Sequence, residues 1–256
     1  MKLKVLCLNL WLGGRLMDGV IDFLRQQDAD ILLLQEVYVS DDPKTPENYR
    51  SLDTITSELP YEHADFAPAL IDNMPEGKVL SGNAVLSRLP ILSRDVTFFR
   101  EPFSERPHPQ DPQYMPSSPR NLQHVQLKTS AGPLEIYNFQ GVWDLDGDNY
   151  SDRRREMSQK IIEAIKNKQN VILAGDTNAQ PTNKAIQEVE KHLTSVFGTE
   201  LKSTFNMKHK TNPGYATARV DMIFVSPNIK VLEKRCHDVD ISDHLPLTAT
   251  LEVSDR

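Results

Sequence analysis

Two short motifs in the second half of the chain carry side chains suited to phosphate chemistry. In Gly175-Asp176-Thr177-Asn178, a carboxylate and an amide lie two positions apart after an apolar segment. A carboxylate at such a turn can orient or deprotonate a water molecule, and an amide can donate a hydrogen bond to a phosphate oxygen. The alternative is an ordinary turn, because Asp and Asn favour turns in any case.

The second motif is Ser242-Asp243-His244, which precedes the last apolar run of the chain. A histidine next to an aspartate can polarise or protonate a phosphate near neutral pH. The alternative is a turn that merely begins a strand. Three further polar residues stand where apolar segments end or begin, namely Asn9, Glu36 and Asp221. Oxygen ligands that converge on one edge of a sheet can hold a hard cation.

These side chains can meet only if the surrounding segments form the right strands. Residues 2–9 and 31–34 are apolar runs of strand length, and residues 20–27 between them have helical spacing. We therefore predict a strand–helix–strand unit whose second strand ends at Gln35-Glu36. Further strands are predicted at 82–87, 91–99, 122–127, 134–139, 171–174, 220–225, 230–235 and 247–253. Two more helices are predicted at 48–59 and 152–168, the latter capped by Ser151 or Asp152.

Two long segments, 101–119 and 202–219, are predicted to be loops, and long loops in compact domains tend to be functional. The second loop and its borders hold a group of basic residues that could form a phosphate-binding rim. They are Lys202, Lys208, His209, Lys210 and Arg219. Trp11 and Trp143 each follow a candidate site residue, so they could stack on a ring of a ligand or simply pack in the core.

The composition is that of an ordinary folded domain, with 39% hydrophobic and 25% charged residues in 256. We expect one domain over residues 1–256. The formal net charge of −7 argues against broad nucleic-acid binding, because such surfaces are usually basic. Cys7 and Cys236 predict two buried thiols rather than a disulfide framework. We see no signal peptide and no membrane span, and therefore expect a cytoplasmic location.

Taken in order, the motifs resemble those of the endonuclease/exonuclease/phosphatase superfamily, whose members include DNase I-like nucleases and inositol-polyphosphate phosphatases. The resemblance covers nearly the whole chain. It implies an α/β (α+β) fold, a four-layered α-β-β-α sandwich of the DNase I type. The segments that carry it are Leu6–Asn9, Leu34–Val37, Gly82–Ser87, Gly175–Asn178, Arg219–Phe224 and Ser242–His244.

The resemblance also implies a site and a cofactor. Glu36 would bind Mg²⁺, or Mn²⁺ as a substitute, with Asn9 and Asp243 close to the ion. Asp176 would activate water, and His244, oriented by Asp221, would polarise the phosphate. Phosphate oxygens would be held by Asn178 and Gln140, and also by Asn83 and Arg120 unless these are structural residues.

One position departs from the family pattern. Gln140 stands where the family usually has a histidine, and a glutamine can donate a hydrogen bond but cannot carry a proton. The leading hypothesis is a Mg²⁺-dependent phosphoesterase that cleaves a phosphodiester or phosphomonoester by direct in-line attack of water. Its partner would be a nucleic acid or a small phosphate. The alternatives are a non-catalytic scaffold that keeps the fold and a calcium module at residues 144–148.

Overall fold

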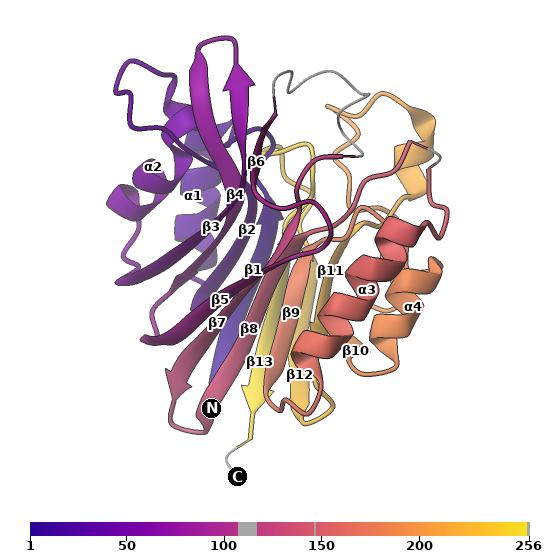
Figure 1. Cartoon of the computed structure of the whole chain (residues 1–256). Coiled ribbons are helices and arrows are strands. Elements are labelled where there is room, and N and C mark those ends of the chain that lie inside the picture. The colour runs from indigo at the N-terminus through magenta and orange to yellow at the C-terminus, as the bar shows by residue number, and fades with distance from the viewer. Residues whose placement is uncertain (107–116, 146, 255–256) are drawn as a thin grey trace.

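The computed structural model describes residues 1–106, 117–145 and 147–254. Two β-sheets pack face to face, and helices cover the outer face of each sheet (Figure 1). The layers therefore follow the order α, β, β, α, which confirms the fold expected from the sequence. In the described residues, no helix has the length and apolar character needed to cross a membrane.

The first sheet contains seven of the described strands: β1 (Lys2–Asn9), β2 (Ile31–Val39), β3 (His63–Met74), β4 (Gly77–Ser87), β6 (Ser104–Arg106), β12 (Ile229–Cys236) and β13 (Leu247–Val253). Their order across the sheet is β12-β13-β1-β2-β4-β3-β6. β1 and β2 run parallel and are joined by α1 (Met17–Gln27). A 3-10 turn (Glu47–Arg50) and α2 (Ser51–Glu58) follow β2.

The second sheet contains six of the described strands: β5 (Ile91–Phe98), β7 (Asn121–Thr129), β8 (Gly132–Gln140), β9 (Val171–Asp176), β10 (Thr194–Ser195) and β11 (Asp221–Val225). Their order is β10-β11-β9-β8-β7-β5. The parallel pair β8–β9 is joined by α3 (Asp152–Ile165), and α4 (Lys184–Glu190) follows β9. A 3-10 turn (Pro213–Thr217) lies in the loop before β11.

Strand β1 is apolar on both faces because it lies between two layers. Val5 and Cys7 join the cluster between the sheets, while Leu6 and Leu8 join the cluster under α1 and α2. Since adjacent residues of a strand point to opposite faces, an unbroken apolar run is what a strand covered on both sides requires.

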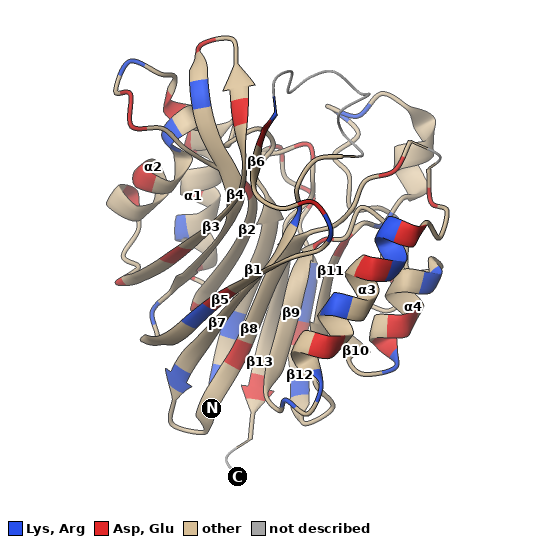
Figure 2. Cartoon of the chain, in the orientation of Figure 1, with Lys and Arg blue, Asp and Glu red and all other residues tan. Residues whose placement is uncertain are grey.

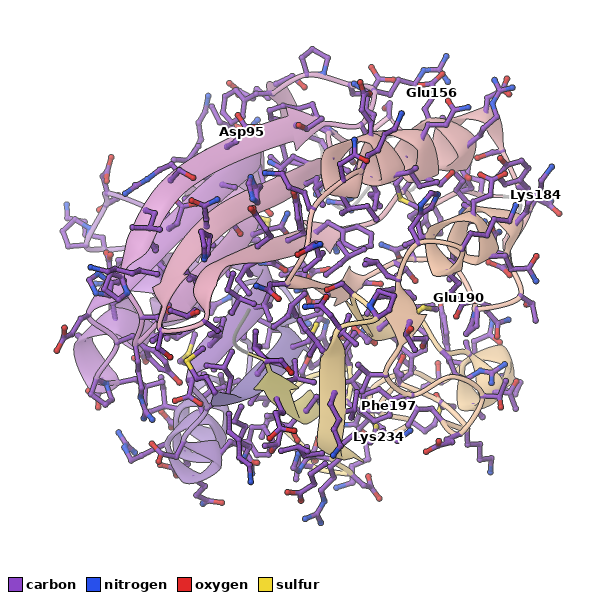
Figure 3. The ribbon with its side chains drawn as sticks, turned by 90° about the horizontal axis from the view of Figure 1, so that it is seen from below. Asp95, Glu156, Lys184, Glu190, Phe197 and Lys234 are labelled. Atoms are coloured by element: carbon purple, nitrogen blue, oxygen red, sulfur yellow. The ribbon has the colours of Figure 1, made fainter. Side chains whose placement is uncertain are left out.

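Helix α3 shows the amphipathic spacing expected of a helix on the surface. Its buried stripe of Met157, Ile161 and Ile165 packs on the second sheet together with residues of α4. Seen from below, Glu156 of α3 and Lys184 of α4 lie at the outer edge of the molecule (Figure 3). Acidic and basic residues are mixed along the outer side of α3 (Figure 2), so the net negative charge is not concentrated there.

The predicted elements are present, but several boundaries differ. The second strand does not end at Glu36, because β2 continues to Val39 through a bulge between Leu34 and Val37. Strands β3, β6 and β10 and helix α4 were not predicted. β3 contains Pro68 and alternates buried with half-buried positions, which makes its pattern weak, and α4 has only seven residues. Residues 107–116 of the first long loop lie outside the described residues.

Candidate active site

The polar strand ends of both sheets meet at one end of the sandwich. Gln140, Asp176 and Asp221 form a row across β8, β9 and β11, since Asp176 is the register partner of both neighbours. Asn9, at the end of β1, reaches this row from the other sheet through a 3.1 Å hydrogen bond from its Nδ2 to Asp176 Oδ2. Sheet pairing therefore places Gln140, Asp176 and Asp221, and the side chain of Asn9 joins them from the other sheet.

Glu36 is held by unusual backbone geometry. It has a φ of 54° within the bulge of β2, and the turn after β1 has positive φ at Trp11, Leu12, Gly13 and Gly14. Positive φ in bulky residues costs on the order of 1–3 kcal/mol each and is concentrated at functional sites. The turn wraps around Glu36, because the Leu12 N–H donates to Oε2 over 2.8 Å and the Gly13 N–H donates to the carbonyl oxygen over 3.0 Å.

The Glu36 carboxylate is ionised in spite of its surroundings. Its Oε1 accepts hydrogen bonds from Asn9 Nδ2 at 3.1 Å and from Gln140 Nε2 at 2.8 Å. Burial raises the pKa of Glu36, but the Leu12 N–H, the charge of His244 and the Asn9 amide together bring the pKa below its usual value. A carboxylate held in its charged form by several donors is suited to bind a cation.

The pKa of Asp176 is shifted in the opposite direction. Burial, together with the nearby charges of Asp221 and Glu36, raises the pKa of Asp176 to about 6, although His244 and the Asn178 N–H act against this shift. The Asn178 N–H donates to Oδ1 over 3.0 Å, and Asn9 holds Oδ2. A carboxylate with a pKa near neutrality is well matched to removing a proton from water.

The strand that delivers Asp176 needs the glycine before it. A Cβ atom on Gly175 would lie 1.9 Å from the carbonyl oxygen of Phe139 on the neighbouring strand β8. Only glycine therefore allows β8 and β9 to approach closely enough at this point. The glycine of the predicted Gly-Asp-x-Asn motif has a packing role, which leaves the chemistry to Asp176 and Asn178.

His244 is paired with Asp221. Its Nδ1 lies 2.9 Å from Oδ2 and 3.1 Å from Oδ1 of that residue, and both side chains are buried. Burial lowers the pKa of His244, but the charge and hydrogen bond of Asp221, with Asp176 and Asp243, raise it to about 10. The imidazole is therefore protonated at neutral pH, and its Nε2 side is available as a proton donor.

Lys210 is half-buried and contacts a residue of the site directly. Its Nζ is 2.6 Å from Asp243 Oδ2, and it lies over the rings of Phe205 and Tyr215 at 5.4 and 5.5 Å. The neighbouring Lys208 and His209 instead bind the exposed Asp240. The sequence suggested a basic loop but carried no signal that separated Lys210 from its neighbours.

The remaining predicted residues lie at different distances from the centre. Asn178 directs its Nδ2 to the carbonyl oxygen of Gly141 at 3.1 Å. Arg120 forms no ion pair with the site carboxylates among the described residues, yet its positive charge helps to lower the pKa of Glu36. Asn83 is fully buried and donates to Asn121 at 2.9 Å, and its Oδ1 has no partner among the described residues.

The sequence profile of the Endonuclease/Exonuclease/phosphatase family matches residues 6–244, which is most of the chain. The chain belongs to this family. A search of curated proteins gave no match. Solved structures share the fold at low sequence identity. A family member from Beutenbergia cavernae has a TM-score of 0.75 and 18% identity, and the alignment covers 98% of this chain and 72% of that one.

Two other solved structures with this fold carry more specific names. The mannosyl-6-phosphatase Bt3783 of Bacteroides thetaiotaomicron has a TM-score of 0.71 and 19% identity, with 98% of this chain and 99% of that chain covered. A humanized D. rerio TDP2 has a TM-score of 0.69 and 16% identity, with the same coverage of both chains. At these identities the likeness concerns the fold.

The site has the oxygen-rich character of a metal centre of this family. Asp176, Asp221 and His244 offer ligand atoms that all lie within 4.8 Å of one another. His244 is an unfavourable ligand in that group, because Asp221 occupies its Nδ1 and a protonated ring has no nitrogen lone pair to offer a metal. Glu36, ionised and half-buried, presents a carboxylate beside the same group, so the donor set fits a hard cation.

Proposed function

We propose that this protein is a Mg²⁺-dependent phosphoesterase, with Mn²⁺ as a substitute, that hydrolyses a phosphate ester by direct in-line attack of water. One observation carries the proposal. An ionised Glu36 and an Asp176 with a pKa of about 6 both accept a hydrogen bond from Asn9 Nδ2, and a protonated His244 lies within 4.8 Å of Asp176. A carboxylate for a cation, a base for water and a hydrogen-bond donor for phosphate are what direct hydrolysis requires.

Glu36 would hold the ion, with Asn9 and Asp243 beside it. When bound, the ion neutralises charge on a non-bridging phosphate oxygen and on the leaving oxygen. We assign the ion to the Glu36 side rather than to His244, since His244 is protonated and engaged by Asp221. Asn9 acts mainly through its amide group, which donates to Glu36 and to Asp176, because its Oδ1 already accepts from the Trp11 N–H at 2.9 Å.

Asp176 and His244 have separate roles in the reaction. Asp176 takes the proton of the attacking water, with its two oxygens fixed by Asn9 and by the Asn178 N–H. His244 donates a hydrogen bond to a phosphate oxygen, and Asp221 keeps its ring oriented and charged, as in other carboxylate–histidine pairs. The leaving oxygen takes up a proton from solvent, and Asp176 returns its proton to solvent.

Amide and cationic groups complete the phosphate site. Each side-chain amide nitrogen carries two N–H groups, so Gln140 can hold Glu36 with one and a phosphate oxygen with the other. Asn178 donates one of its two amide N–H groups to the Gly141 carbonyl oxygen and can donate the other to a phosphate oxygen. Arg120 and Lys210 supply positive charge. Asn83 supports the strand region around Asn121 from inside the core and, in our proposal, makes no direct contact with phosphate.

A small phosphate is favoured over a nucleic acid as the substrate. The Bacteroides thetaiotaomicron relative is named a mannosyl-6-phosphatase, which supports a phosphomonoester. The formal net charge of −7 disfavours a long polyanion. A nuclease activity is the second candidate, because the same group of residues would serve a diester.

The test is a panel of p-nitrophenyl phosphate, bis-p-nitrophenyl phosphate and an abasic DNA duplex, with Mg²⁺, Mn²⁺ or EDTA. We expect metal-dependent turnover that Glu36→Gln lowers by about two orders of magnitude or more, since even outer residues of metal sites cost about 10–100-fold. Glu58→Gln, on the exposed end of α2, is the matched control. Unchanged turnover in Glu36→Gln would sink the assignment, and no turnover with any substrate would favour a non-catalytic scaffold.

A further inference from the structure

A cavity of about 400 Å³ lies beside the candidate active site, between the loop after β8 and the loop before β11. Two residues belong to both the cavity and the site. Asn178 binds Asp176 through its N–H, and the ring of Phe205 lies 4.6 Å from that of His244. The cavity is of a size that small-molecule pockets have, roughly 300–1,000 Å³. Its position is next to the atoms that we expect to react.

The walls of the cavity are largely aromatic and apolar. Trp143 and Leu145 come from the loop after β8, and Phe205 and Tyr215 come from the loop before β11. Phe205 and Tyr215 pack with ring centroids 4.6 Å apart, and Leu145 is 61% exposed at the mouth. Flat aromatic walls favour a ligand that has a flat or ring-shaped face.

The charged groups in the cavity are already paired within the protein. The charged residues that line it, among those described, are Asp144, Asp148 and Arg154, and Arg154 lies 3.6 and 3.8 Å from the two carboxylates. Arg154 is 2% exposed, and its guanidinium donates to the carbonyl oxygens of Gly147, Asn149 and Asn178 at 2.6–2.8 Å. A second phosphate placed here would meet two carboxylates and no lysine, which is unfavourable for a polyanion.

Lys210 brings a positive charge to the catalytic end of the cavity. Lys210 lies over Phe205 and Tyr215, where the cavity meets the site, and its Nζ points to Asp243. Elsewhere in the lining, Gln180 and Asp148 offer amide and carboxylate groups that can bind hydroxyl or amino groups. The combined surface therefore offers a positive charge for an anion near Lys210 and aromatic walls for a ring next to it.

We infer that this cavity binds the uncharged ring to which the reacting phosphate is attached. The inference rests on the proposed function and gives it a substrate class, the phosphomonoester of a small ring compound. A sugar ring and a nucleoside share the required chemistry, which is a neutral ring with hydroxyl or amino groups at its edge.

The activity test compares two ring substrates, glucose 6-phosphate and adenosine 5′-monophosphate, with the ringless glycerol 3-phosphate, all with Mg²⁺. We expect kcat/KM to be about tenfold higher or more for at least one ring substrate, since stacking on one aromatic side chain is worth about this much. Trp143→Ala should reduce that ratio toward one, and Trp143→Phe should restore most of it. Leu92→Ala, which removes another exposed apolar side chain far away on β5, should keep the ratio. The better of the two ring substrates distinguishes sugar from nucleoside.

A binding test separates this inference from the proposed function. The sequence has two tryptophans, so Trp11→Phe leaves Trp143 as the single fluorescent reporter. Adding methyl glucoside or adenosine, which carry no phosphate, should change its emission, and glycerol should not. A change in emission without hydrolysis would support the cavity and reject the phosphoesterase. Hydrolysis with equal kcat/KM for ring and ringless substrates and no change in emission would overturn the cavity inference alone.

Discussion

Gln140 Nε2 lies 2.8 Å from Glu36 Oε1, so the residue that departs from the family pattern is bonded to the carboxylate that we expect to hold the ion. The bond joins the second sheet to the first, since Gln140 ends β8 and Glu36 lies in β2. Glutamine cannot carry a proton, but it keeps a donor on Glu36. Glutamine in place of the family's histidine therefore removes a possible positive charge from the site but keeps a hydrogen bond to Glu36.

Gln140→Leu should weaken the binding of Mn²⁺ by about tenfold, because outer residues that orient metal ligands typically contribute about 10–100-fold. Gln140→His retains a donor and should bind Mn²⁺ more tightly than Gln140→Leu does. Isothermal titration of the purified proteins measures both. Gln159→Leu, on the exposed side of α3, is the control. Equal affinity in Gln140→Leu and the wild type would show that the hydrogen bond has no role in the metal site.

The core of the site could be predicted because its residues stand at the ends of buried strands. Asn9, Asp176 and Asp221 are polar residues that border apolar runs, and sheet pairing brings such ends together. Glu36 was identified by its motif, although the strand was predicted to end there. Its positive φ depends on the turn at Trp11–Gly14, and local sequence does not reveal that contact between two segments.

Loop residues could not be placed in the same way. Nothing in the sequence distinguishes Lys210 from its neighbours Lys208 and His209. The folded loop directs Lys210 toward Asp243 and the two neighbours toward Asp240. The ring-binding cavity combines Trp143 and Tyr215 from separate loops without regular periodicity. Such contacts depend on tertiary packing, to which patterns of apolar residues are insensitive.

Lys210→Met should strengthen the binding of the metal ion and weaken the binding of the substrate. The ammonium group neutralises Asp243, so its removal should tighten Mn²⁺ binding by about tenfold, which corresponds to about 1.4 kcal/mol. The same change removes a positive charge from the phosphate site and should raise KM. Lys208→Met is a matched control, because Lys208 pairs with the exposed Asp240. Titration calorimetry and initial rates measure the two effects, and a fall in Mn²⁺ affinity would contradict this account of Lys210.

The pH dependence of kcat/KM should be bell-shaped. Asp176 must be deprotonated to accept a proton, so activity should rise with pH through about 6, or lower when the ion is bound. His244 must be protonated to donate, so activity should fall as pH passes about 10. Asp221→Asn removes the charge that raises the pKa of His244 and should move the alkaline limb to lower pH. Asp240→Asn, which alters an exposed aspartate, should leave that limb in place. An alkaline limb that stays unchanged in Asp221→Asn would exclude His244 as the hydrogen-bond donor to phosphate.

The stability of the metal-free protein should also depend on His244. Its pKa is about 10 in the folded protein against 6.5 for the ordinary residue, so its contribution is complete below pH 6.5 and is lost as pH rises through about 10. Urea unfolding in EDTA from pH 6.5 to 9 should therefore show a free energy of unfolding that falls by at most about 1.4 kcal/mol per pH unit from this group.

His244→Gln should remove that slope, and His237→Gln provides the control. His237 is buried and donates to or accepts from Thr248 Oγ1 at 2.8 Å, and burial lowers its pKa to about 4. Its contribution is complete above pH 6.5 and is lost only as pH falls, so His237→Gln should keep the slope between pH 6.5 and 9. The same slope in wild type and His244→Gln would mean that Asp221 does not hold His244 in its charged form.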